Sequence, residues 1–66
     1  MTTLRLVIPD MACGACVETI TKVLHSLDPV AGVSTNLQTK VVEVNTSLDR
    51  SLIIEGITKA GYTVQP

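Results

Sequence analysis

Both cysteines of the chain, Cys13 and Cys16, are separated by two residues, and the second leads into a segment with helical periodicity. Two thiols at this spacing can converge on a single point. Such a pair suits either a soft metal ion or a reversible disulfide. Thiolates select monovalent copper, which accepts as few as two ligands, whereas structural zinc normally takes four. The pair therefore favours Cu(I), but a CxxC motif alone is only moderately specific, and the rest of the chain must decide.

The elements around the cysteines follow from the spacing of apolar residues. Residues 3–8 alternate, which predicts a strand, and Pro9 ends it because proline has no amide proton to donate to a neighbouring strand. A loop over residues 10–14 leads to an amphipathic helix, which Asp28-Pro29 stops. The apolar positions of this helix are Val17, Ile20, Val23, Leu24 and Leu27.

The second half of the chain changes period. Residues 33–37 and 41–44 predict two strands joined by a short polar turn, hence a hairpin. After several residues suited to a helix start, a second helix runs to Gly61, which suits the left-handed conformation at a helix end. Within this helix, Gly56 is either a weak point or a place of close packing. Residues 62–64 predict a last brief strand.

The predicted order is strand, helix, strand, strand, helix, strand. Two such halves predict a ferredoxin-like α+β sandwich (βαββαβ), in which two helices cover one face of a four-stranded antiparallel sheet. Residues 1–66 are expected to form one domain, near the lower size limit for an unaided core. The cysteines then fall on the loop between the first strand and the first helix, at one end of the molecule.

The composition excludes several functions. Hydrophobic residues make up 45% of the chain, with no Phe, no Trp and one Tyr, so the core must be aliphatic. A net charge of −1 without a basic run or aromatic platform excludes nucleic-acid binding. No apolar run approaches the roughly 20 residues that span a bilayer, and the N-terminus lacks a signal peptide, so we expect no membrane insertion and a cytoplasmic location. The closely spaced cysteines favour a reducing compartment over a structural disulfide.

Three features combine into a pattern more specific than the cysteine spacing. They are the Met-x-Cys-x-x-Cys motif formed by Met11, Cys13 and Cys16, the order of the elements, and an Ala-Gly-Tyr segment ending at Tyr62. With these features, the whole chain resembles a heavy-metal-associated domain, the module of free copper chaperones and of the cytosolic N-terminal domains of copper-transporting P-type ATPases. The resemblance implies that Cys13 and Cys16 bind Cu(I), that Tyr62 lies in the loop beside them, and that the partner is a similar domain of a copper ATPase.

Physical reasons give the residues of the motif different roles. A helix N-terminus stabilises negative charge, so Cys16 in the first turn is expected to have a lowered pKa. Cys13, earlier on the loop, is expected to be more exposed and to be the ligand that exchanges. Met11 is expected to pack into the core and anchor the loop rather than to act as a third ligand. Tyr62 is either an aromatic residue at the core edge or a residue that contacts the metal loop.

Asp10 departs from the family pattern, which commonly has glycine before the motif methionine. Its carboxylate is a harder ligand that would admit Zn(II) or Cd(II). The favoured interpretation is a solvated loop residue or a cap for the following helix. His25, about 13 Å further along the helix than Cys16, is expected to be a solvated surface residue. The cations Lys22, Lys40, Arg50 and Lys59 are expected only to solubilise the chain.

The preferred hypothesis is a small copper chaperone, a carrier rather than an enzyme, and the start at Met1 and the compact ending at Pro66 favour it. It would pass Cu(I) by ligand exchange to a similar domain of a copper ATPase. The alternative is an excised metal-binding domain of an ATPase for copper, zinc or cadmium. A thiol oxidoreductase is disfavoured, because the CxxC contains no proline and nothing else resembles thioredoxin. The sequence does not decide whether metal-bridged homodimers form through the exposed loop.

Overall fold

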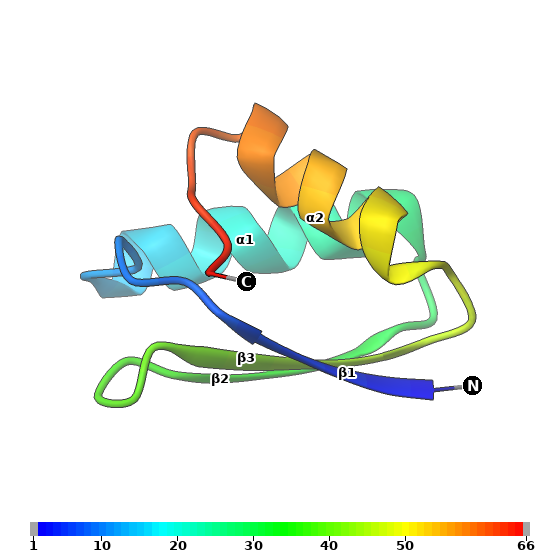
Figure 1. The fold of residues 1–66 in the computed structure, drawn as a ribbon, viewed down its shortest axis with the longest axis horizontal. Coiled ribbons are helices and arrows are strands. Elements are labelled where there is room, and N and C mark those ends of the chain that lie inside the picture. Colours follow the sequence, from blue (N-terminus) through cyan, green and yellow to red (C-terminus); the bar gives the residue numbers. More distant parts are fainter. Residues whose placement is uncertain (1, 66) are drawn as a thin grey trace.

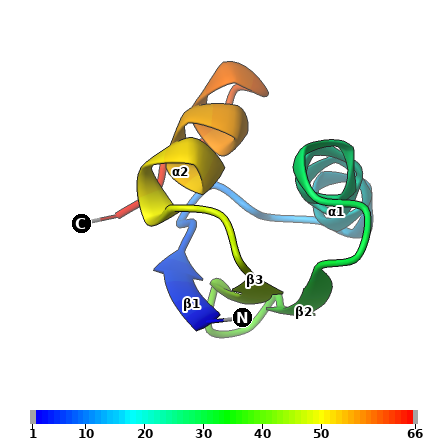
Figure 2. The same ribbon diagram turned by 90° about the vertical axis from the view of Figure 1, so that its right-hand side faces the viewer.

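The computed structural model describes residues 2–65 (Figure 1), and Met1 and Pro66, the ends of the predicted domain, lie outside this range. An antiparallel sheet lies under two helices that run side by side across one of its faces (Figure 2). Neither helix among the described residues has the length and apolar content needed to cross a membrane. In chain order the elements are β1 (Thr2–Val7), α1 (Gly14–Leu27), β2 (Gly32–Asn36), β3 (Val41–Thr46) and α2 (Arg50–Lys59).

The central strand of the sheet is β3, which pairs with β1 on one side and β2 on the other. Leu6 lies opposite Val42, and Arg5 lies opposite Glu43. Because successive side chains of a strand point to opposite faces, Leu6 and Val42 are buried under the helices while Arg5 and Glu43 face solvent. The predicted alternation of the first strand and the predicted hairpin are both confirmed.

The core fills the space between the helices and the sheet. Ile20 and Leu24 of α1 and Ile53 and Ile57 of α2 have no exposed surface, and burying each such side chain stabilises the fold by roughly 1.5–3 kcal/mol. Both helices therefore turn an apolar face inward, although Leu27, the last predicted apolar position of α1, is 39% exposed. The buried apolar residues are Leu6, Ile8, Met11, Ile20, Leu24, Ala31, Val42, Val44, Ile53 and Ile57.

Gly56 is a place of close packing between the two helices. A Cβ atom at this position would lie 2.6 Å from Leu27 Cδ1 and 3.4 Å from Val23 Cγ1. The glycine therefore lets α1 and α2 approach each other, which decides between the two alternatives that the sequence left open. Gly61, just beyond α2, has a φ of +99°, as expected for a glycine that ends a helix.

The four-stranded sheet is not observed, because the described residues form only three strands. The C-terminal segment makes a single antiparallel bridge, in which the Gln65 amide donates to the Val7 carbonyl at 2.7 Å. This register places Thr63 opposite Pro9, which has no amide proton to donate. The Thr63 amide donates instead to the carboxylate of Asp10. The ladder beside β1 therefore does not continue with a full pair of hydrogen bonds at this position, and the last predicted strand is reduced to one bridge.

Candidate metal centre

The cysteine loop, residues 8–13, joins β1 to α1. It lies at the same end of the molecule as the β2–β3 turn and the segment that follows α2 (Figure 1). Its first part is a turn in which the Met11 amide donates to the Ile8 carbonyl at 3.0 Å. Pro9 occupies the second position of this turn, where its fixed φ is favoured. The loop therefore leaves β1 with a defined direction before it reaches the cysteines.

The two thiols converge at the start of α1. Cys13 is the N-cap residue, with extended backbone (φ −153°, ψ 169°) and a side chain that makes no capping hydrogen bond. Cys16 follows one turn later, and the two sulfur atoms lie 3.0 Å apart as a hydrogen-bonded pair of free thiols. Cys13 is exposed and Cys16 is half-buried. The spacing of the cysteines thus brings both sulfurs to one point, with Cys13 the more accessible of the two.

The environment of Cys16 favours its thiolate. Its pKa is lowered from 9.0 to about 7, chiefly by a hydrogen bond from the Tyr62 hydroxyl and then by hydrogen bonds with the Cys13 thiol and the backbone. The same contact raises the pKa of Tyr62, because the ionised phenol would lose its hydrogen bond to Cys16 and would be repelled by the thiolate. The sequence predicts the direction of the Cys16 shift from the helix N-terminus, whereas the structure assigns its largest part to Tyr62.

Met11 anchors the loop in the core. Its side chain has no exposed surface and belongs to the main cluster of buried apolar residues. Its thioether sulfur is therefore enclosed by hydrocarbon in this structure, and it is not available at the surface as a third ligand beside the two thiols. This placement matches the anchoring role expected for an unbranched side chain that fills gaps in a core.

Asp10 is an exposed residue of the loop, as the favoured interpretation predicts, and it also contacts the segment after α2, which the sequence does not predict. Both oxygens of its carboxylate accept the Thr63 amide, at 3.1 Å each. It does not cap α1, whose N-cap position is Cys13 and lacks a side-chain hydrogen bond. Across residues 2–65 no three His, Cys, Asp or Glu side chains gather into a metal-binding cluster, so Asp10 does not form a three-ligand site with the cysteines here.

Lys40 contacts the cysteine loop, and the sequence does not predict this contact. Its ammonium donates to the Met11 carbonyl at 3.0 Å, and its own carbonyl accepts the Ile8 amide at 2.8 Å. Its φ of +64° is left-handed, a conformation that costs roughly 1–2 kcal/mol for a residue with a Cβ atom. The interpretation of Lys40 as only a solubilising charge is therefore wrong. Because its partners lie about 30 residues away in the chain, only its place at the end of a hairpin turn gives a local signal.

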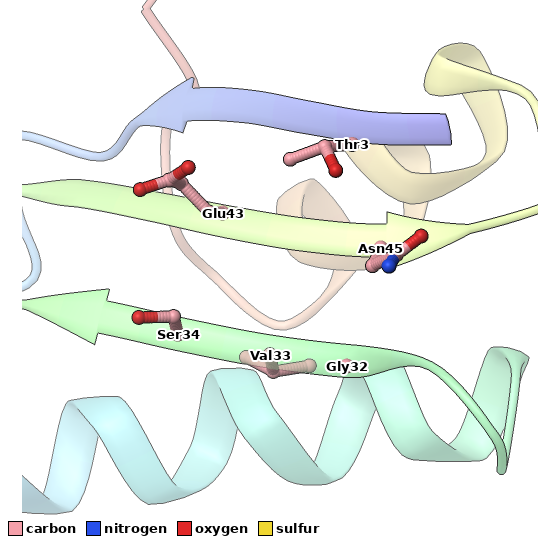
Figure 3. A pocket seen from close by; sticks show the side chains of 6 residues that line it. All are labelled: Thr3, Gly32, Val33, Ser34, Glu43 and Asn45. Carbon is pink, nitrogen blue, oxygen red and sulfur yellow. The ribbon is translucent and has the colours of Figure 1, made fainter. Parts of the chain in front are cut away.

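His25 and a surface cavity on the sheet both lie apart from the thiols. The His25 ring is hydrogen-bonded to the Ala31 carbonyl at 3.1 Å, so it contacts the turn after α1 rather than only solvent. A shallow cavity of about 290 Å³ lies on the open face of the sheet (Figure 3). It contains one carboxylate and neither thiol nor imidazole, so it is not a metal site. Its lining residues are Thr3, Gly32, Val33, Ser34, Glu43 and Asn45.

A small α+β domain with two convergent thiols on a loop at one end is the architecture of a metal-binding domain with thiolate ligands. The chain matches the model of the heavy-metal-associated domain over residues 5–63. It therefore belongs to the heavy-metal-associated domain family. No curated protein sequence matches the chain significantly.

Several solved structures share this fold over nearly the whole chain. The copper chaperone Atx1 from Synechocystis PCC6803, in a trimeric form, is 34% identical, with a TM-score of 0.92 over 94% of this chain and 98% of its own. A gold binding protein is 38% identical, with a TM-score of 0.89 over 92% of this chain and 94% of its own. The CopZ metallochaperone is 25% identical, with a TM-score of 0.89 over 97% of this chain and 100% of its own. The chain is thus similar to small metal-carrying proteins in both sequence and fold.

Proposed function

We propose that this protein is a cytoplasmic metallochaperone, acting as a single domain, that carries one Cu(I) ion on Cys13 and Cys16. It passes the ion by ligand exchange to a similar domain of a copper-transporting P-type ATPase. The observation that carries this proposal is the pair of free sulfurs 3.0 Å apart at one end of the molecule, with Cys13 exposed. The protein is a carrier rather than an enzyme, and the metal is its cargo.

The chemistry of the pair favours a soft monovalent ion. Thiolates are the ligands that Cu(I) prefers, and two of them complete a linear coordination that Zn(II) does not accept. A metal ion must displace the thiol protons, and the Cys16 pKa of about 7 lowers the cost of that displacement at neutral pH. The similarity to proteins named for copper and for gold agrees with a site for soft metals.

Transfer requires that a second pair of thiols reach the ion. Cys13 is the exposed ligand, so an incoming thiolate would replace it first while Cys16 keeps the metal. Gly14, between them, faces open space, because a Cβ atom built there has no neighbour within 4 Å. Replacing Gly14 by a larger residue is therefore expected to leave the fold stable and to slow transfer by obstructing the partner.

The alternative cargo is Zn(II) or Cd(II), which would need more ligands than two thiols. Asp10 is the candidate oxygen ligand, and it would have to leave the Thr63 amide to bind a metal. Breaking that contact costs free energy, which supports Cu(I) as the preferred ion. If Asp10→Ala weakens zinc retention and leaves copper retention unchanged, then the carboxylate is a metal ligand and the choice of copper is overturned.

The test of the site is metal stoichiometry in the reduced protein. We expect one Cu(I) per chain, and a large loss of affinity in Cys13→Ser and in Cys16→Ser when a Cu(I) chelator of known affinity competes for the ion. His25→Gln, which alters a metal-binding side chain outside the loop, serves as the matched control and is expected to bind like the parent. Tight binding by the double serine variant would refute the site.

The test of the carrier role is partner capture. The Cu(I)-loaded protein is expected to retain a metal-binding domain of a copper ATPase in a pull-down and to transfer the ion to it, whereas the metal-free protein is not. A monomer that becomes a dimer only when loaded with Cu(I) would indicate a metal-bridged homodimer. Measurable turnover in an insulin-reduction assay would favour a thiol oxidoreductase instead.

A further inference from the structure

We propose that Asp10 is a positioning residue for the metal site: its carboxylate holds the segment after α2, which carries Tyr62, against the cysteine loop. This inference rests on the proposed function, because it concerns the same two thiols. It gives Asp10 a role other than that of a metal ligand.

The contact lies directly beside Tyr62. The amide that donates to both Asp10 oxygens, at 3.1 Å each, belongs to Thr63 and therefore to the peptide group that follows Tyr62. The peptide group that precedes Tyr62 is held as well, because the Tyr62 amide donates to the Ile57 carbonyl at 3.3 Å. Tyr62 is thus fixed from both sides, by α2 before it and by Asp10 after it.

Asp10 is the acceptor that the Thr63 amide uses on the cysteine loop. In the register set by the Gln65 bridge, Thr63 faces Pro9, which cannot complete a pair of ladder hydrogen bonds. Gly61, immediately before Tyr62, has a φ of +99° and open space around it, so it offers the chain an easy pivot. Without the carboxylate, the chain between Gly61 and the Gln65 bridge would keep only the hydrogen bond from the Tyr62 amide to the Ile57 carbonyl, which would leave Tyr62 less firmly held beside the cysteine loop.

Lys40 holds the other side of the same loop. Its carbonyl accepts the Ile8 amide and its ammonium donates to the Met11 carbonyl, so it spans the turn that carries Asp10. Its left-handed φ of +64° is unusual for a lysine, and the contact with the loop gives a reason for that conformation. Asp10 therefore connects two segments that are each held in place, and the contact can set the position of one relative to the other.

Two substitutions separate the charge of Asp10 from its hydrogen bond, which makes the proposal testable. Loss of an outer contact that orients a ligand weakens metal binding, typically by about 10–100-fold. Asp10→Ala removes both the charge and the contact, whereas Asp10→Asn removes the charge and keeps one oxygen acceptor for the Thr63 amide.

The decisive measurement is Cu(I) affinity by chelator competition, together with the melting temperature of each variant. We expect Asp10→Ala to bind copper about tenfold more weakly, the low end of the usual range for such contacts. Asp10→Asn, which keeps an acceptor for the Thr63 amide, is expected to match the parent, and so is Asp49→Ala, which removes a carboxylate at the other end of the fold. Copper affinity in Asp10→Ala equal to or above that of the parent would overturn the proposal.

Two readouts on the metal-free protein separate this proposal from the proposed function. The Thr63 amide of Asp10→Ala is expected to exchange its hydrogen about tenfold faster, as befits the loss of one charge-assisted hydrogen bond. Tyr62 is the only tyrosine and the chain has no tryptophan, so its emission reports on this site alone and is expected to become more accessible to acrylamide. If neither changes, the positioning role is refuted. If both change but the parent protein does not bind Cu(I), the positioning of Tyr62 holds and the proposed function fails.

Discussion

Replacing Tyr62 by Phe removes one hydroxyl and keeps the ring that packs against the core. The hydroxyl is the largest cause of the lowered pKa of Cys16. With a pKa of about 7, about half of the Cys16 thiols are ionised at pH 7, whereas the unperturbed value of 9.0 would leave about 1%. The hydrogen bonds from Cys13 and the backbone remain in the variant, so its Cys16 pKa is expected to rise to between these limits. The fraction of thiolate at neutral pH then falls several-fold.

The assay is the rate of alkylation of Cys16 as a function of pH, with the two cysteines resolved by mass spectrometry. Since the thiolate is the nucleophile, the midpoint of the profile reports the pKa of Cys16. A midpoint that stays at about 7 in Tyr62→Phe would refute the assignment of the shift to Tyr62.

The same substitution makes a prediction about stability, whose sign follows from the lowered pKa of the folded state. The stabilisation from ionised Cys16 is fully present above the unfolded pKa of about 9 and is lost as the pH falls through about 7. The melting temperature of Tyr62→Phe is therefore expected to fall below that of the parent more at pH 9 than at pH 6. An equal difference at both pH values would contradict this linkage.

Three further substitutions test the packing of the fold, one of them at the cysteine loop. Met11→Ala is expected to lower the free energy of unfolding by about 2–5 kcal/mol in a denaturant titration, because it empties a fully buried position, and a loss below about 1 kcal/mol would argue against the anchor. Thr46→Val is expected to cost about 1–3 kcal/mol, because it leaves the buried carboxylate of Asp28 without the hydroxyl that donates to it at 2.6 Å, and a neutral result would mean that water replaces this contact. Gly56→Val is expected to cost about 1–3 kcal/mol in thermal unfolding through its clash with Leu27, and a rise in melting temperature would show that Leu27 moves aside freely.

The helices, the first strand and the hairpin were predictable because each has a local signal. A helix or a strand that lies on a core must repeat its apolar residues with its own period, and short-range rules for proline and glycine mark its ends. The convergence of Cys13 and Cys16 is equally local, since one helical turn brings the two sulfurs together. For the same reason the sequence predicted Cys13 as the more exposed residue of the pair.

Contacts between distant parts of the chain left no such signal. The prediction of a fourth strand was wrong. A ladder at residues 62–64 depends on the residues opposite them, and Pro9 lies opposite Thr63. The partner of Asp10 lies 53 residues away and that of Lys40 lies 29 residues away, so neither contact appears in any periodic pattern. Each of these contacts joins a side chain to a backbone group. Every residue has a backbone group, so the residue types in the sequence do not predict which one is used.

The sequence by itself thus determined the family, the two thiols and their place at the start of a helix, because these depend on residue types and short spacings. Only the tertiary structure decided which groups surround the thiols. It places the Tyr62 hydroxyl at Cys16, the Asp10 carboxylate on the segment that carries Tyr62, and Lys40 beneath the turn. The physical reason is that the acidity and accessibility of a thiol depend on the groups that fold around it, and these come from three separate parts of the chain.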